Sequence, residues 1–139
     1  MKNFMDDQDF LLSTKTGEEL FHNFAEGMPI VDYHCHISPK EIWDDKRFEN
    51  ITEVWLGGDH YKWRLMRANG VDERFITGDA PAREKFQKWA ETLGRCVGNP
   101  VFEWSHLELK RYFGYEGVLN GKTAQEVWDL ANAKLAEAS

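Results

Sequence analysis

The chain has 139 residues, of which 42% are hydrophobic and 14% aromatic, and its formal charge is -7. A chain of this length and apolar content can bury a core, which excludes an intrinsically disordered protein. No apolar run approaches the roughly 18 residues that a membrane span needs, and the excess of acidic residues disfavours nucleic acid as a partner. We therefore expect a cytoplasmic globular protein with neither a membrane nor a nucleic-acid partner.

The first elements expected are one helix and one strand. Thr16 and Glu19 form a capping box that predicts a helix over residues 17–26. Residues 28–37 are rich in β-branched and aromatic side chains, with Pro29 at the leading edge, and this pattern predicts the only strand.

Every later segment is predicted to be helical. Apolar side chains recur at helical spacing in residues 82–93 and again after Thr123, which with Glu126 forms a second capping box. Expected core residues are Phe86, Trp89, Ala90, Leu93, Leu107, Leu109, Tyr112, Phe113, Val127, Leu130, Ala131 and Leu135. The predicted fold class is therefore mainly α, with about six helices and one short strand.

Two histidines at the end of the predicted strand are the first candidate site. His34 and His36 are two residues apart, so a strand places both on one face with Asp32, while Cys35 points away to pack. Two imidazoles at this spacing can converge on one divalent metal. The simpler interpretation is a pair of structural histidines, and a catalytic zinc needs a third ligand, which must come from elsewhere.

The second candidate site is a segment with two glycines followed by a polar helix start, residues 55–70. Tyr61 and Arg64 are three residues apart and share a helix face, and the free N–H groups at a helix start favour an anion. We interpret this face as a possible site for a small anionic molecule, with a solvated basic face as the alternative. The remaining histidines, His22, His60 and His106, are predicted to be structural.

Several long motifs resemble the amino-terminal part of the uronate isomerase (glucuronate isomerase) family. They are the runs at residues 32–41, 55–70, 77–79, 98–100 and 104–113, and the similarity extends from about residue 10 to residue 135. The resemblance implies a member of the amidohydrolase superfamily, a metal-dependent (β/α)8 barrel that interconverts D-glucuronate with D-fructuronate and D-galacturonate with D-tagaturonate.

The resemblance also implies roles for individual residues. His34 and His36 would bind a divalent metal, with zinc the expected ion, and Asp32 would orient them. Tyr61 would reach the hexuronate substrate and act in catalysis together with His60, and Arg64 would assist substrate binding. The third metal ligand and the other catalytic groups of the family have no counterpart in these 139 residues.

A barrel of this type needs roughly 250 residues, more than the chain has. We therefore expect residues 1–37 to hold an N-terminal helix and the first barrel strand, and residues 38–139 to be a helical insertion. The chain alone should be inactive, and its unpaired strand should favour a homo-oligomer or another covering partner. Two alternatives remain: a metal hydrolase or deaminase that shares the two-histidine opening, and a helical binding module without catalysis.

Overall fold

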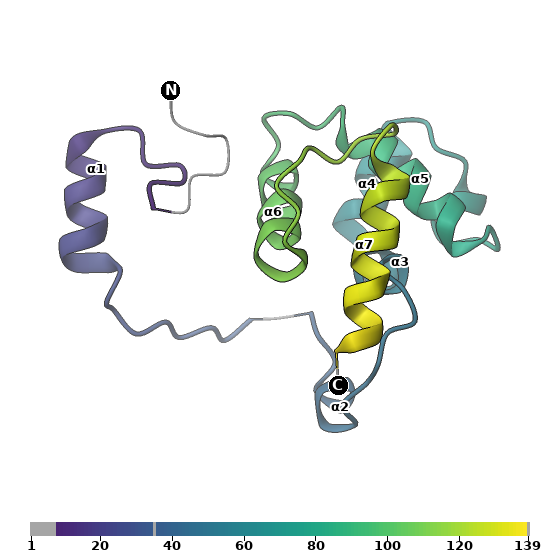
Figure 1. Cartoon of the computed structure of the whole chain (residues 1–139), viewed down its shortest axis with the longest axis horizontal. Helices are drawn as coiled ribbons and strands as arrows, with labels where there is room; N and C mark the ends of the chain where they lie inside the picture. Colours follow the sequence, from purple (N-terminus) through teal and green to yellow (C-terminus); the bar gives the residue numbers. More distant parts are fainter. Residues whose placement is uncertain (1–7, 35, 139) are drawn as a thin grey trace. The chain divides into compact units, whose positions relative to one another are not determined.

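The computed structural model describes residues 8–34 and 36–138. The chain separates into two compact units, Met1–Ile37 and Ser38–Ser139, and helices form the regular structure of both (Figure 1). None of the helices in the described ranges is long and apolar enough to cross a membrane. The assignment of the first unit to a barrel strand and of the second to an insertion stays a prediction.

The first unit holds helix α1 (Lys15–Leu20), which continues as a π-helical turn, η1 (Phe21–Ala25). The predicted capping box at Thr16 is wrong. The helix is capped by Thr14, whose hydroxyl accepts the N–H of Gly17 at 3.0 Å. Thr14 is extended and stands outside the helix, as an N-cap must, whereas Thr16 already lies inside the first turn.

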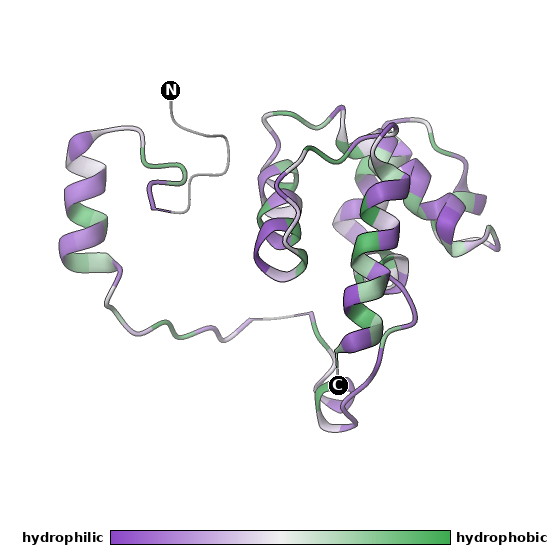
Figure 2. Ribbon diagram, viewed as in Figure 1, coloured by the Kyte–Doolittle hydropathy of each residue, from purple (hydrophilic) through white to green (hydrophobic). Residues whose placement is uncertain are grey.

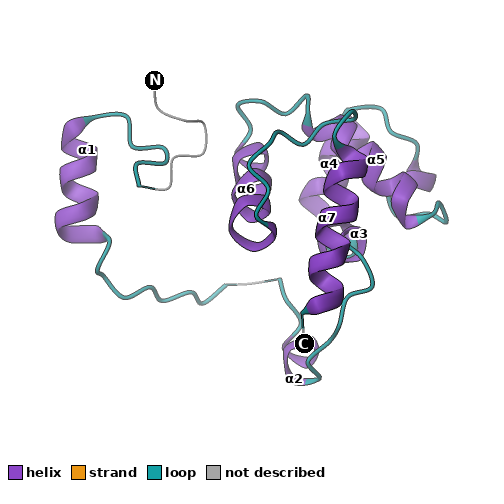
Figure 3. Cartoon of the chain, in the orientation of Figure 1, coloured by secondary structure: helices purple, strands orange, loops and turns teal. Residues whose placement is uncertain are grey.

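The strand predicted over residues 28–37 is not formed among the described residues of the segment. The described residues of this segment are extended but join no ladder, and Figure 3 shows helices and loops without a strand in the described part of the chain. A strand exists only when a neighbour pairs with its N–H and C=O groups, and the described residues supply none. Ile30 is 91% exposed and Tyr33 94% exposed, so the β-type side chains are present without a partner. The predicted packing of Cys35 lies outside the described residues.

The second unit begins at a short helix, α2 (Pro39–Trp43), and continues through five longer helical segments and two short turns. These are α3 (Ile51–Leu56), α4 (His60–Ala68), the 3-10 turn η2 (Glu73–Phe75), α5 (Ala82–Leu93), α6 (Pro100–Glu108), the π-helical turn η3 (Leu109–Phe113) and α7 (Ala124–Glu137). Asn50, Asp59 and Asn99 cap α3, α4 and α6 through their side chains. The mainly helical fold class is therefore confirmed, with seven α-helices among the described residues where about six were expected.

The core of the second unit is built on α5. Phe86, Trp89, Ala90 and Leu93 are all fully buried, as the helical spacing predicted. Along α7, hydrophobic stretches alternate with hydrophilic ones (Figure 2), as expected for a helix with one buried face. The other helices contribute buried side chains to the same cluster: Ile51, Trp55, Met66, Phe102, Leu109, Val127 and Ala131.

Two details of the predicted pattern differ in this unit. Tyr112 is 74% exposed instead of buried, because the wider π-helical turn η3 shifts the register so that Phe113 faces the core. Thr123 does not cap α7 through its side chain. Its hydroxyl instead accepts the N–H of Asn120 at 2.9 Å and donates to the carbonyl of Val118 at 2.8 Å, which stabilises the preceding loop.

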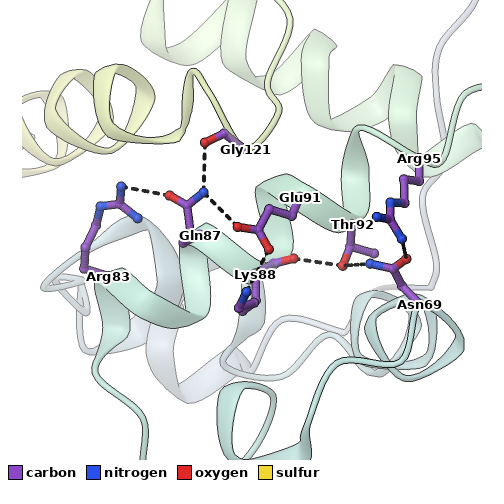
Figure 4. Close-up of polar contacts among 8 residues, drawn as sticks. All are labelled: Asn69, Arg83, Gln87, Lys88, Glu91, Thr92, Arg95 and Gly121. Carbon is purple, nitrogen blue, oxygen red and sulfur yellow. Dashed lines mark hydrogen bonds and ion pairs between the residues drawn. The ribbon is translucent and has the colours of Figure 1, made fainter.

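The polar face of α5 is tied to its surroundings by side-chain hydrogen bonds (Figure 4). Gln87 donates through Nε2 to the carbonyl of Gly121 at 2.8 Å, which holds the loop before α7. Thr92 accepts from Nδ2 of Asn69 at 3.0 Å, which joins α5 to the end of α4. Both faces of α5 therefore help to fix the helices around it.

His106 is a buried histidine whose two ring nitrogens both have backbone partners. Nε2 accepts the N–H of Leu119 at 2.9 Å, so the proton lies on Nδ1, which donates to the carbonyl of Phe102 at 2.6 Å. Burial lowers the pKa of His106, although the Phe102 carbonyl and Glu103 act in the opposite direction. The neutral ring thus joins α6 to the loop that precedes α7, which confirms its structural role.

We expect His106→Leu to be less stable than His106→Gln by about 1–3 kcal/mol, because leucine leaves the buried N–H of Leu119 without an acceptor.

A lowered pKa means that the neutral form of His106 stabilises the fold fully above the unfolded value of about 6.5. This contribution is lost as the pH falls below that value. The wild type should therefore lose stability relative to His106→Gln between pH 7.5 and 5.5. Urea unfolding followed by tryptophan fluorescence measures this, since the six tryptophans all lie in residues 43–128. Parallel pH curves for the two proteins would contradict the assignment.

Candidate functional site

The two histidines of the extended segment face each other. Nε2 of His34 lies 2.9 Å from Nε2 of His36, and the ring centroids are 4.9 Å apart. Oδ1 of Asp32 accepts the backbone N–H of His34 at 3.2 Å, so this carboxylate contacts the histidine backbone. The i, i+2 spacing thus brings the two imidazoles together, as predicted, without the strand ladder that we expected.

The two imidazole nitrogens of this pair could supply part of the donor set of a metal site. Two nitrogens bound at about 2.0–2.1 Å to a tetrahedral zinc lie about 3.3 Å apart, close to the separation found here. No group of three or more histidine, cysteine, aspartate or glutamate side chains suitable for a metal is present in residues 8–34 and 36–138. Two imidazole nitrogens therefore lie at a separation that suits a metal, and the described residues supply no group of three that could hold one.

The start of α4 carries the other predicted site residues. His60 and Tyr61 stack with their ring centroids 4.6 Å apart, and the guanidinium carbon of Arg64 lies 5.6 Å from the Tyr61 ring. All three side chains are exposed, Tyr61 to 54%. A cation and two aromatic rings are therefore clustered on one exposed helix face, which suits an anionic ligand with a polar, ring-sized body.

The N-cap of α4 is the most strongly bonded group near this cluster. Oδ1 of Asp59 accepts the N–H groups of Tyr61 at 3.0 Å and Lys62 at 3.2 Å, and Oδ2 accepts from Nζ of Lys62 at 2.6 Å. Burial would raise the pKa of Asp59, but the hydrogen bond and charge of Lys62 and the two N–H donors outweigh it and lower the pKa. The first turn of α4 is therefore fixed by an ionised aspartate.

Sequence reasoning missed the buried partners of this cap. Lys62 is almost buried, and Glu108 of α6 accepts from Nε1 of Trp55 at 2.7 Å. Burial raises the pKa of Glu108, while the charge of Lys62 and the hydrogen bond from Trp55 oppose that rise. The spacing of Asp59 and Lys62 was a usable signal for their ion pair, but nothing in the sequence placed Glu108 beside them.

His22 and a surface crevice are two further features of the described residues, and neither is part of the histidine pair or the α4 cluster. His22 contacts Asp9 at 3.0 Å and Glu26 at 3.1 Å, and the hydrogen bonds to these carboxylates raise its pKa. A surface crevice of about 230 Å³ contains none of the predicted site residues. Its lining residues are Glu49, Asn50, Thr52, Glu53, Leu56, Gly57, Ile76, Ala80, Ala82 and Lys85. The histidine pair belongs to the first unit and the α4 cluster to the second.

Comparison with known proteins identifies the family. The model of the glucuronate isomerase family matches residues 1–139, which is the whole chain. The chain therefore belongs to the glucuronate isomerase family. The resemblance that the sequence motifs indicated is confirmed.

Individual relatives agree with this assignment. The chain is 70% identical over 139 residues to the uronate isomerase of Lachnospira eligens and 65% identical over 139 residues to that of Endomicrobium trichonymphae. Each match covers 100% of this chain and 30% of the relative, so the chain spans about a third of their length. The crystal structure of uronate isomerase from Thermotoga maritima matches 94% of this chain and 29% of its own, with 42% identity and a TM-score of 0.85.

Proposed function

We propose that the chain forms the amino-terminal part of a uronate isomerase, which interconverts D-glucuronate with D-fructuronate and D-galacturonate with D-tagaturonate. The observation that carries this proposal is the family match over all 139 residues, together with 70% identity to a uronate isomerase. In this proposal the complete active site forms only when the chain is joined to the additional sequence that its relatives contain.

The histidine pair supplies the metal ligands of the proposed enzyme. His34 and His36 would hold a divalent ion, zinc in the first instance, through the two Nε2 atoms that already face each other. When bound, such an ion acts as a Lewis acid that stabilises negative charge on sugar oxygens. Asp32 holds the backbone of His34 and so helps to keep its ring in place.

The α4 cluster supplies groups that bind and orient the sugar acid. Isomerisation moves a proton from C2 to C1 of the open-chain sugar, so a group that accepts or donates a proton must lie beside these carbons. The hydroxyl of Tyr61 is suited to this role, and the stacked ring of His60 fixes the tyrosine ring. The guanidinium of Arg64, on the same face, is suited to the carboxylate of the hexuronate.

The extended segment supplies the first strand of a (β/α)8 barrel of the amidohydrolase type in this proposal. Its support is the run of exposed apolar side chains in residues 28–37, among them Ile30, Val31 and Tyr33. Exposed apolar side chains of this kind favour a covering partner; in a barrel, the interior and the outer helices would cover them, while neighbouring strands would pair with the backbone edges. The second unit would then be a helical insertion after that strand.

A chimera tests the activity. The 139 matched residues of the Lachnospira eligens uronate isomerase are replaced by this chain, and conversion of D-glucuronate and D-galacturonate is followed by NMR. We expect the chimera to form both ketoses and the 139-residue chain alone to form neither. Turnover by the chain alone would contradict the proposal of an incomplete site, and hydrolysis of lactones or amides without isomerisation would favour the metal hydrolase alternative.

Metal analysis tests the histidine pair. In the chimera, His34→Ala should weaken zinc binding by at least about 100-fold. Removal of a residue that only hydrogen-bonds to a metal ligand already lowers metal affinity by about 10-fold to 100-fold. Zinc content is measured by mass spectrometry after dialysis at a series of free-zinc concentrations. His22→Ala is the matched control, because His22 is a histidine of the same unit that is bonded to Asp9 and Glu26 instead. Equal zinc content in the two variants would contradict the assignment.

Kinetics test the α4 cluster. Tyr61→Phe in the chimera should lower kcat by about 10²-fold to 10⁴-fold, the usual worth of a positioned proton carrier. Arg64→Met should raise KM by about 10-fold to 100-fold, because a charge-assisted hydrogen bond to the carboxylate is lost. Arg67→Met is the control, since that guanidinium, one turn further along, is bound to Glu73 at 2.8 Å. Variants of Tyr61 and Arg64 with wild-type kinetics would exclude this face from the substrate site.

A further inference from the structure

A buried lysine lies next to the exposed tyrosine at the start of α4. The side chain of Lys62 is 11% exposed, whereas Tyr61 is 54% exposed. With 3.6 residues per turn, neighbouring residues on a helix point about 100° apart. The direction in which Lys62 is held therefore determines the direction in which Tyr61 points.

The surroundings of Lys62 are built to hold a positive charge. Its ammonium donates to Oδ2 of Asp59 at 2.6 Å and lies 5.9 Å from the centre of the Trp55 ring. Trp55 in turn donates to Glu108, a half-buried carboxylate that the charge of Lys62 stabilises. A buried ammonium without such partners would be strongly destabilising, so Lys62 is confined to this one orientation.

The orientation of Lys62 affects the first turn of α4, the turn whose N–H groups have no helical partners. The first four N–H groups of a helix have no helical partner, and Asp59 accepts two of them. Trp63, at the end of this turn, donates from Nε1 to the carbonyl of Leu56 at 2.7 Å and so ties the turn to the end of α3. Met66 is fully buried, but it anchors the following turn. Lys62 is the buried residue of the first turn, and Trp63 beside it is partly buried against the core.

We propose that Lys62 is a positioning residue of the sugar-acid site. Paired with Asp59 and placed over the Trp55 ring, it fixes the first turn of α4 and so presents Tyr61, with the stacked His60, to the hexuronate. This inference rests on the proposed function, in which Tyr61 contacts the substrate. Lys62 itself is turned inward and acts through its neighbour.

Kinetics of the chimera provide the first test. Lys62→Met should lower kcat/KM for D-glucuronate by about tenfold or more. A displacement of about 1 Å in a group such as the Tyr61 hydroxyl is enough to lower the rate by this factor. Lys62→Arg keeps the positive charge beside Asp59 and should recover most of that loss. Lys88→Met is the matched control, since Lys88 forms an i, i+3 ion pair with Glu91 at 2.9 Å but is 38% exposed on α5. Equal kcat/KM for Lys62→Met and Lys88→Met would overturn the proposal.

A second variant separates positioning from a loss of folding. Lys62→Met leaves Glu108 without its positive neighbour, so the double variant Lys62→Met/Glu108→Gln removes that unpaired charge while glutamine still accepts from Trp55. If Lys62 positions Tyr61, the double variant should melt close to the wild type and still show the loss in kcat/KM. Recovery of both the melting temperature and kcat/KM would show that Lys62 only stabilises the fold, which overturns the proposal.

A measurement without substrate keeps this inference distinct from the proposed function. In the 139-residue chain, nuclear Overhauser effects between the rings of His60 and Tyr61 report their stacking. These effects should weaken in Lys62→Met and persist in Lys62→Arg and Lys88→Met. If they weaken while Tyr61→Phe leaves catalysis unchanged, the role of Tyr61 fails and the positioning by Lys62 stands. If they persist in Lys62→Met, the positioning fails whatever the role of Tyr61.

Discussion

Burial of the apolar face of α5 is the interaction on which the second unit depends. Phe86 and Trp89 are large aromatic side chains with no exposed surface, and burying each contributes about 1.5–3 kcal/mol or more. Helices α3, α4 and α7 all pack against α5, so their relative positions depend on it. The place of Asp59 and Lys62 beside Trp55 follows from this packing, because the Trp55 ring contacts the Phe86 ring in a tilted arrangement with centroids 6.2 Å apart.

Polar groups decide the details that apolar packing leaves open. The N–H of Ile51 at the start of α3 donates to the side-chain carbonyl of Asn132 on α7, at 2.9 Å, and the hydroxyl of Thr52 donates to the carbonyl of Ala82, at 2.7 Å. Together with His106, these bonds satisfy buried groups at helix ends and in loops that would otherwise cost about 1–3 kcal/mol each. Each has one geometry, so they select one arrangement of the helices from the several that the apolar faces would allow.

The sequence predicts this fold well where the signal is local. The spacing of Phe86, Trp89 and Leu93 predicted α5 at its observed bounds, and the polar helix start predicted within residues 55–70 is the start of α4. Prediction from the sequence failed where the local structure depends on a residue that is distant in the chain. Thr123 has the capping sequence, but Val118 and Asn120 compete for its hydroxyl. The β-type residues near Ile30 pair with no strand in the part of the chain that the structure describes. Glu108 was missed for the same reason, since its role depends on a tryptophan 53 residues away.

The same distinction separates the two candidate groups, the histidine pair and the α4 cluster. The histidine pair is a local structure: two residues apart in an extended backbone, His34 and His36 bring their Nε2 atoms to 2.9 Å without help from a sheet. Its spacing therefore sufficed to predict that two donors converge, whereas a third ligand must come from a separate part of a fold. The α4 cluster is local only in Tyr61 and Arg64. Its orientation is a tertiary property, because it depends on a lysine whose burial is possible only after α3 and α6 have placed Trp55 and Glu108 around it.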